Sequence, residues 1–225
     1  HMIENPELKR RILEISYNNR LSHLGSCLTA VDILYEIFQQ KQPEERFVLS
    51  SGHAGVALYT VLEAMGGRNA EEIFEHHGVH PDRCIDCGID CSSGSLGQGL
   101  PISVGMALAN RRKNVYCLIS DGETAEGSIW EALRIAYEQK LDNLHIYLNA
   151  NWYGAYSEIN PYKLQKRVEA FGFPVDVRIS RLYSSVLNGQ DAHYKVLNEK
   201  EYKTLMQEYM VDTEDHIMQS FRGGS

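Results

Sequence analysis

Two short polar segments carry the side chains best suited to chemistry, Ser-Asp-Gly-Glu at 120–123 and Asn-Ala-Asn at 149–151. Each follows an apolar run typical of a buried strand, so the Asp121 carboxylate and the Asn151 amide should emerge at neighbouring strand ends. Gly122 lets the backbone turn sharply beside a ligand. Carboxylate and amide oxygens suit Mg²⁺ or Ca²⁺, and Mg²⁺ commonly takes further ligands from phosphates and water. The pattern therefore predicts a site for a metal-bound diphosphate, with Asn149 as the alternative second ligand.

The elements that must position these residues alternate along the chain. Apolar periodicity predicts helices over 5–18, from a cap at Thr29 to residue 38, over 52–65, 96–110 and 126–140, and strands over 47–50, 115–119 and 144–148. This alternation predicts an α/β fold with a doubly wound, mostly parallel sheet and helices on both faces. We expect one domain over 3–210 and a carboxyl-terminal tail over 211–225.

The composition argues against several classes of protein. A net charge of −8 provides no basic surface for nucleic acid or an anionic membrane. No apolar run approaches the roughly 20 residues of a membrane span, and the amino terminus does not resemble a signal peptide. We therefore expect a cytoplasmic protein without nucleic-acid or membrane partners. A Rossmann nucleotide binder is disfavoured because no Gly-x-Gly-x-x-Gly follows a predicted strand.

At the predicted metal motif, the chain resembles the thiamine-diphosphate-binding half of transketolases. The family's motif is Gly-Asp-Gly closed by a later Asn, and the interval here, 151 − 121 = 30 residues, matches the family spacing. Ser120 replaces the first glycine of that motif. The resemblance implies thiamine diphosphate as cofactor, Asp121 and Asn151 as side-chain ligands of the metal, and the backbone carbonyl of Tyr153 as the third ligand.

Four further motifs follow in the order of the family, at 22–25 (Ser-His-Leu-Gly), 51–54 (Ser-Gly-His-Ala), 80–81 (His-Pro) and 193–195 (His-Tyr-Lys). Imidazoles exchange protons near neutral pH and can hydrogen-bond sugar hydroxyls and a developing oxyanion. The resemblance implies four catalytic residues, which are His23, His53, His80 and His193.

The remaining cofactor contacts are also implied by the resemblance. The run 93–99 (Ser-Gly-Ser-Leu-Gly-Gln-Gly) matches a family signature, which places Gly94 and Leu96 close to the aminopyrimidine ring. His53 would lie near the thiazolium ring, and Gly122 beside the diphosphate. Glu126 matches a family glutamate that couples cofactor sites at the subunit interface. A helix-start charge is the alternative for Glu126.

Two other acidic residues receive only a structural interpretation. Glu123 and Glu131 are expected to be a helix-start and a helix-face charge, respectively.

The resemblance covers residues 5–210 and implies transfer of a two-carbon ketol unit from a ketose to an aldose. The family's pyrimidine-binding domain is not in the sequence, so we expect a split transketolase. A separately encoded pyrimidine-binding subunit would supply the activating glutamate, self-association would give an α2β2 assembly, and this chain alone would be inactive. The alternatives are a related thiamine-diphosphate enzyme, such as a 2-oxo-acid decarboxylating subunit or dihydroxyacetone synthase, and a non-catalytic cofactor-binding subunit.

The segment 171–193 is shorter than the family usually has. We expect that the last strand-helix unit and a loop over the site are missing or rebuilt. A changed channel would favour a specialised sugar pathway over the general pentose phosphate pathway.

Cys84, Cys87 and Cys91 lie close together in the sequence, shortly after His76 and His77. Such residues can form a tetrahedral zinc site, although the spacing lacks a second, distant ligand pair. Five cysteines in a chain expected to be cytoplasmic favour reduced thiols. We therefore expect unliganded thiols near the entrance to the site, with zinc as the alternative.

Overall fold

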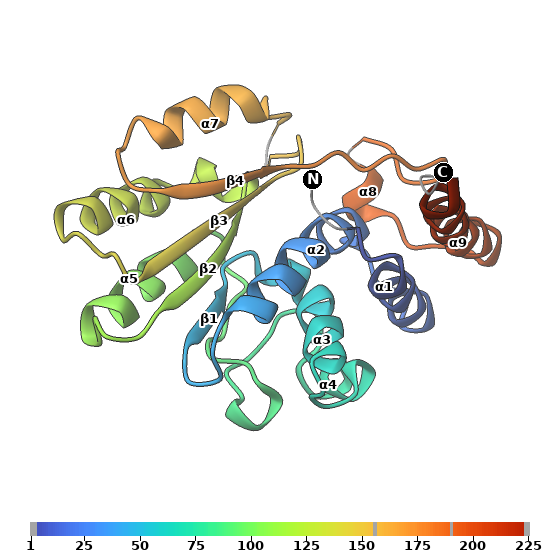
Figure 1. The fold of residues 1–225 in the computed structure, drawn as a ribbon, viewed down its shortest axis with the longest axis horizontal. Helices are drawn as coiled ribbons and strands as arrows, with labels where there is room; N and C mark the ends of the chain where they lie inside the picture. The colour runs from blue at the N-terminus through green and yellow to red at the C-terminus, as the bar shows by residue number, and fades with distance from the viewer. Residues whose placement is uncertain (1–3, 155–156, 190, 223–225) are drawn as a thin grey trace.

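The fold is built on a parallel four-stranded sheet with the strand order β1-β2-β3-β4 (Figure 1). The structure is a computed structural model that describes residues 4–154, 157–189 and 191–222. The strands are β1 (Arg46–Leu49), β2 (Val115–Ser120), β3 (Leu144–Ala150) and β4 (Val175–Ile179). Ser120 pairs with Asn149, so β2 and β3 end at the same edge of the sheet. This register brings the two polar segments of the sequence together.

Helices cover both faces of the sheet because the strands are apolar on both sides. On β2, Tyr116 and Leu118 pack into one hydrophobic cluster, whereas Val115, Cys117 and Ile119 pack into the other. The first cluster is covered by α1 (Pro6–Asn18), α2 (Leu24–Gln40) and α3 (Gly55–Ala64). The second is covered by α5 (Gly99–Ala109), α6 (Gly127–Glu138) and α7 (Pro161–Glu169). The predicted α/β fold with helices on both faces is confirmed.

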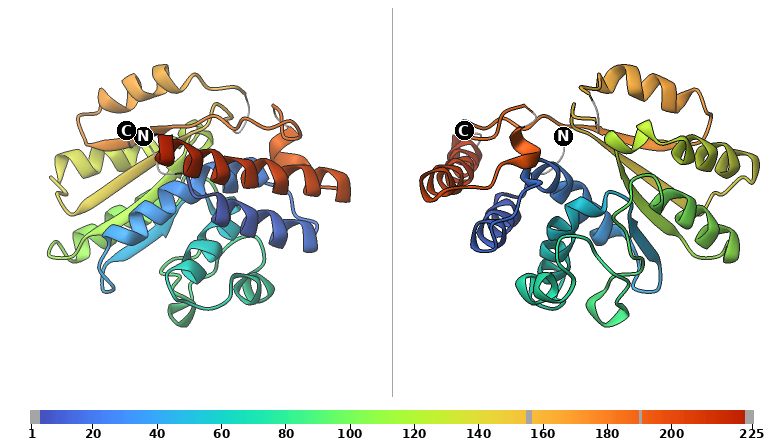
Figure 2. Two further views of the ribbon diagram at one scale, coloured as in Figure 1. Left: turned by 45° about the vertical axis from the view of Figure 1, so that its right-hand side comes forward. Right: turned by 180° about the vertical axis from the view of Figure 1, so that it is seen from behind.

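The other helices lie around this layered core. They are α4 (Ala70–His77), α8 (Asp191–Tyr194), α9 (Glu199–Arg222) and the short 3₁₀ helices η1 (Gly52–Ala54), η2 (Ile85–Cys87) and η3 (Gly122–Ala125). Figure 2 shows α9 alongside α1, where the rings of Tyr17 and Tyr202 stack at 4.3 Å between centroids. The predicted boundary between the domain and the carboxyl-terminal tail, at 210–211, falls within α9 and stays a prediction. Residue 3 of the predicted domain and residues 223–225 of the predicted tail lie outside the described ranges. In the part of the chain that the structure describes, no helix has the length and apolar character needed to cross a bilayer.

The second predicted helix begins earlier than expected. Thr29 does not cap α2, which starts at Leu24, because the Thr29 hydroxyl donates to the carbonyl of Gly25 within the helix at 2.8 Å. The backbone enters α2 through His23, whose φ of 63° is left-handed. Conversely, α5 starts three residues later than predicted because Gly97 adopts a φ of 81° that ends the preceding turn.

The prediction did not include the strand β4 or the helices α4, α7, α8 and α9. β4 lies within 171–193 and pairs with β3, so the strand of the last unit is present despite the short segment. The short helix α8 follows it.

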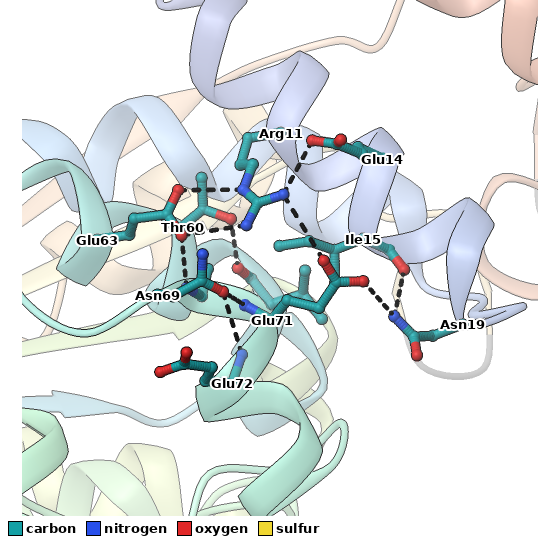
Figure 3. A network of polar contacts seen from close by, with 11 residues as sticks. Arg11, Glu14, Ile15, Asn19, Thr60, Glu63, Asn69, Glu71 and Glu72 are labelled. Carbon is teal, nitrogen blue, oxygen red and sulfur yellow. Dashed lines mark hydrogen bonds and ion pairs between the residues drawn. The ribbon is translucent and has the colours of Figure 1, made fainter.

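A polar network joins α1, α3 and α4 (Figure 3). The Arg11 guanidinium donates from Nε to Glu63 at 3.0 Å and from Nη1 to Glu14 at 2.9 Å. The Asn69 side chain caps α4 by accepting the backbone N–H groups of Glu71 and Glu72. The network fixes the start of α4, the helix whose other end leads to His80.

Two loops approach each other closely at the carboxyl edge of the sheet. A Cβ added at Gly52 would lie 2.6 Å from the backbone nitrogen of Gly94. Glycine is required here because any side chain would collide with the neighbouring backbone. The close approach places η1 directly against the glycine-rich run at 93–99.

Candidate functional site

A cavity of about 270 Å³ opens at the carboxyl edge of the sheet. It is lined by the predicted site residues His23, His53, His80, Gly94, Leu96, Asp121, Gly122, Asn151, Tyr153 and His193, and also by Asn149. The structure thus brings together every predicted site residue except Glu126. Its location agrees with the general position of ligands in open α/β sheets.

Asp121 lies at the end of β2 with only 1% of its surface exposed. One carboxylate oxygen accepts the N–H of Gly122 at 2.9 Å, and the other accepts the backbone N–H of Asn151 at 2.9 Å. Burial raises the pKa of the Asp121 carboxyl to about 7, although these hydrogen bonds act in the opposite direction. Among the described residues, no lysine or arginine forms an ion pair with it. A divalent cation in the cavity would stabilise the ionised form.

The side chains of Asn149 and Asn151 converge on one hydroxyl group. Both amides donate to Oγ1 of Thr29, at 3.0 and 3.2 Å. The Asn149 oxygen accepts the Ser180 hydroxyl and the Asn151 oxygen accepts the Tyr153 N–H, each at 3.3 Å. Thr29, which lies in α2, therefore orients the amides of both asparagines at the end of β3. The sequence predicted only a helix cap for Thr29.

The backbone between Asn151 and Tyr153 has an unusual conformation. Trp152 has a φ of 79°, which is rare for a residue with a side chain and costs roughly 1 kcal/mol or more. The loop is fixed by a bond from the Gly154 N–H to the Ser157 carbonyl at 2.9 Å. This turn brings Tyr153 and Gly154 to the cavity wall.

The four predicted histidines form the other part of the cavity. The rings of His23 and His53 lie 5.6 Å apart between centroids. His193 comes from α8, and its backbone carbonyl accepts the N–H of His23 at 2.7 Å. The ring nitrogen Nδ1 of His193 lies 3.2 Å from the hydroxyl of Ser26. Residues separated widely in the sequence are thus held together by direct hydrogen bonds.

Burial favours the uncharged form of three of these imidazoles by lowering their pKa values. It lowers the pKa of His53 to about 4, and the neighbouring His23, His193 and His80 add a smaller electrostatic contribution. Burial also lowers the pKa of His23 and of His193. A neutral imidazole can both donate and accept a hydrogen bond, which suits recognition of sugar hydroxyls.

Glu123 has a role that its interpretation as a helix-start charge did not include. It is fully buried, and its carboxylate accepts the Ser50 hydroxyl at 2.5 Å, the Gly97 N–H at 3.0 Å and the Ser120 N–H at 2.9 Å. Burial raises the pKa of this carboxyl, and the three donors oppose the shift. The glutamate therefore joins the end of β1, the run 93–99 and the end of β2. Its only sequence signal was its place directly beside the Asp-Gly motif.

Glu126 is half-buried at the start of α6 and does not line the cavity. It lies behind the run 93–99, since a Cβ at Gly97 would come within 2.6 Å of the Glu126 Cβ. Its proposed role at a subunit interface stays a prediction.

The expectation of reduced thiols is wrong for one pair of cysteines. Cys84 and Cys87 form a disulfide, while Cys27, Cys91 and Cys117 are free. The pair is close because the backbones of Cys84 and Ile89 bond reciprocally and close a tight hairpin. Neither sulfur lines the cavity.

We expect Glu123→Gln to lower the free energy of unfolding by about 2 kcal/mol, because an amide group would face N–H and O–H donors. Urea unfolding measures this change. The control is Glu131→Gln on the exposed face of α6, which should change stability by less than about 0.5 kcal/mol. Equal effects of the two substitutions would contradict the structural role of Glu123.

We expect acid to destabilise the protein partly through His53. Its folded-state pKa of about 4 lies below the ordinary value of 6.5, so the unfolded chain takes up the proton first and stability falls as the pH drops from 6.5 towards 4. At pH 5 the His53 imidazole lowers the free energy of unfolding by about 2 kcal/mol relative to its value at neutral pH. Urea unfolding of His53→Asn should therefore show a weaker pH dependence than wild type. His76→Asn, which alters an exposed histidine, should behave as wild type; the same weakening in this control would contradict the assignment to His53.

Comparisons with known proteins agree with this geometry. Residues 15–180 match the family described as "Transketolase, thiamine diphosphate binding domain". The chain is 35% identical over 169 residues to one of the subunits of apulose-4-phosphate transketolase from Phocaeicola vulgatus, covering 66% of this chain and 60% of that protein. It is 35% identical over 179 residues to 6-deoxy-6-sulfo-D-fructose transketolase subunit SqwG from a Clostridium species, covering 69% of this chain and 65% of that protein.

A transketolase from Leishmania mexicana has the same fold, with a TM-score of 0.70 and 19% identity over 93% of this chain and 42% of that one. The chain spans less than two thirds of the length of each of these three proteins. The family match covers well over half of the chain. The protein therefore belongs to the transketolase family, and residues 15–180 form its thiamine diphosphate binding domain.

Proposed function

We propose that this chain is the diphosphate-binding subunit of a split transketolase that transfers a two-carbon ketol unit from a ketose to an aldose. The observation that carries the proposal is the composition of the cavity. Asp121 and Asn151 lie in its wall at the ends of β2 and β3, and four imidazoles line the same cavity. The first pair suits a metal diphosphate, and the imidazoles suit a hydroxyl-rich substrate.

Asp121 and Asn151 would hold Mg²⁺, or Ca²⁺, together with the backbone carbonyl of Tyr153. The donor set fits a hard cation because it consists of oxygens, and because the Asp121 carboxylate is buried without a basic partner among the described residues. The resemblance to the family favours Asn151 over Asn149, since each side-chain oxygen accepts one hydrogen bond of 3.3 Å and bond length does not distinguish them. Gly94 and Leu96 would line the cofactor ring, in agreement with their position in the cavity wall.

The four histidines would contact the sugar. When bound, thiamine diphosphate supplies the electron sink that ketol transfer requires. His53 and His23, with lowered pKa values, would donate hydrogen bonds to substrate oxygens without carrying charge. His193 would be oriented by the Ser26 hydroxyl, and His80 would approach from the turn after α4. These contacts position the substrate and stabilise charge that develops on its carbonyl oxygen.

A separately encoded partner would supply the pyrimidine-binding domain. Two of the relatives are named as subunits of transketolases, which supports a two-component enzyme. In this proposal, two copies of this chain and two partner subunits form an α2β2 assembly in the cytoplasm. The names of the same relatives also favour a specialised sugar substrate over the substrates of the general pentose phosphate pathway.

Two other functions remain to be compared with this one. A 2-oxo-acid decarboxylating enzyme would use Asp121 and Asn151 but would not need four imidazoles facing a sugar. A non-catalytic cofactor-binding subunit would bind thiamine diphosphate without turnover. Product analysis with this chain and its partner subunit distinguishes ketol transfer from 2-oxo-acid decarboxylation and from cofactor binding without turnover.

We expect Asp121→Asn to weaken Mg²⁺-dependent binding of thiamine diphosphate at least about 100-fold, because the amide removes the only anionic ligand of the proposed set. Asn151→Ala should weaken it more than Asn149→Ala. Isothermal titration calorimetry, with and without the partner subunit, measures these affinities, and thermal unfolding verifies that each variant is folded. The matched control is Asp142→Asn at an exposed position, which should bind as wild type. Unchanged affinity in folded Asp121→Asn would refute the metal assignment.

We expect the chain alone to be inactive and the chain together with a separately encoded pyrimidine-binding subunit to catalyse ketol transfer. Product analysis after incubation with Mg²⁺, thiamine diphosphate and paired ketose and aldose substrates tests this. His53→Ala should lower kcat/KM about 100-fold or more, while His76→Ala should not. Turnover of 2-oxo acids instead of ketoses would overturn the proposed reaction. Turnover of xylulose 5-phosphate with ribose 5-phosphate at the rate of a general transketolase would reject the specialised pathway.

A further inference from the structure

A tight hairpin at 84–89 presents two sulfur atoms outside the cavity. Its backbone is closed by bonds of 2.9 Å in both directions between Cys84 and Ile89, and by a bond of 3.1 Å from the Cys87 N–H to the Cys84 carbonyl. Gly88 completes the turn with a φ of 82°. The two cysteines are therefore held on one short, rigid turn, with their Cα atoms 5.2 Å apart.

A histidine side chain from α4 approaches the two cysteines of this turn. His77, the last residue of α4, places its Nε2 3.4 Å from the sulfur of Cys87. The imidazole nitrogen and the two sulfurs all lie within 4.8 Å of one another. A disulfide needs no imidazole beside it, so the position of His77 is unexplained by the cystine alone. Cys91 follows in the same loop, but its sulfur is not in this cluster and donates to the carbonyl of Ser92.

We propose that His77, Cys84 and Cys87 form a zinc-binding site in the reduced protein, with water as the fourth ligand. Two thiolates and one imidazole are the ligands that Zn²⁺ prefers in a tetrahedral site, and the two negative charges neutralise the ion. With Zn–S and Zn–N bonds of about 2.3 and 2.0 Å, the edge between nitrogen and sulfur is about 3.5 Å and the edge between sulfurs about 3.8 Å. The observed 3.4 Å between Nε2 and Sγ matches the first edge.

The disulfide and the metal site exclude each other because both use the same two sulfurs. A dithiol converts the disulfide into two thiols by supplying two electrons and two protons and becoming a disulfide itself. A phosphine does the same by supplying two electrons, while water gives the two protons and its oxygen forms the phosphine oxide. Zinc binding then releases both thiol protons and forms two Zn–S bonds without further oxidation or reduction. His77 and Cys84 are both half-buried, so an ion can reach them from solvent.

The proposed zinc ion would link the end of α4, at His77, to the hairpin at 84–89 through Cys84 and Cys87. The intervening residues 78–83 include His80 of the cavity wall, and the carbonyl of Pro81 accepts the N–H of Ser93 at 3.0 Å. Zinc would thus fix both ends of the segment that carries His80. This consequence goes beyond the proposed catalytic function, and metal binding itself does not depend on that function.

The test is the zinc content of the whole chain after reduction by a phosphine, equilibration with Zn²⁺ and removal of free metal. Elemental analysis by mass spectrometry should give one zinc ion per chain. Titration of free thiols verifies that Cys84 and Cys87 were reduced. Replacement of zinc by Co²⁺ should produce a thiolate-to-cobalt charge-transfer band. Reduced wild type without zinc would overturn the proposal, as would a disulfide that resists reduction in the folded protein.

Matched variants assign the ligands. Cys84→Ser and His77→Asn should lower zinc affinity at least about tenfold, whereas Cys91→Ser and His76→Asn should bind zinc as wild type. Circular dichroism of each variant verifies that it is folded. Equal zinc content in all four variants would refute the site, and loss of zinc in Cys91→Ser would refute the three-residue ligand set. Calorimetry with thiamine diphosphate on the same samples reports separately on the cofactor site.

Discussion

The cavity depends on the buried carboxylate of Glu123. Burial of this group is costly unless donors satisfy it, and the donors come from three segments, Ser50 after β1, Gly97 in the glycine-rich run and Ser120 at the end of β2. Because one side chain accepts from all three, the loops at the carboxyl edge of the sheet cannot move independently. Asp121, two residues before Glu123, is thereby held at the cavity wall.

A second constraint connects the opposite side of the cavity to the sheet. Thr29 of α2 accepts hydrogen bonds from the amides of both Asn149 and Asn151, and donates its own proton within the helix. The backbone bond between His23 and His193 anchors α8 to the start of the same helix. Thus α2 positions Asn151, one of the proposed metal ligands, together with the proposed substrate-facing imidazoles of His23 and His193. This shared support agrees with one cavity that binds the cofactor and the sugar side by side.

Several features of the fold followed from local patterns in the sequence. The apolar runs that became β2 and β3 are buried on both faces, and such runs can be recognised without knowing their neighbours. The start of α2 was not predicted because its first turn contains Gly25 and Ser26, which carry no apolar periodicity. β4 was missed because its residues are only partly buried, so its pattern of apolar residues is weak.

The sequence by itself determined the α/β class and the spacing of Asp121 and Asn151, since these follow from apolar patterns and motif positions along the chain. The histidines that line the cavity were implied by the resemblance of their motifs to the transketolase family. Only the tertiary structure decided that Glu123 is buried while Glu131 is exposed, and that Cys84 bonds to Cys87 with His77 beside them. The physical reason is that burial and hydrogen bonding depend on atoms contributed by distant segments. Identical residue types in similar local sequence therefore acquire different roles when the chain folds.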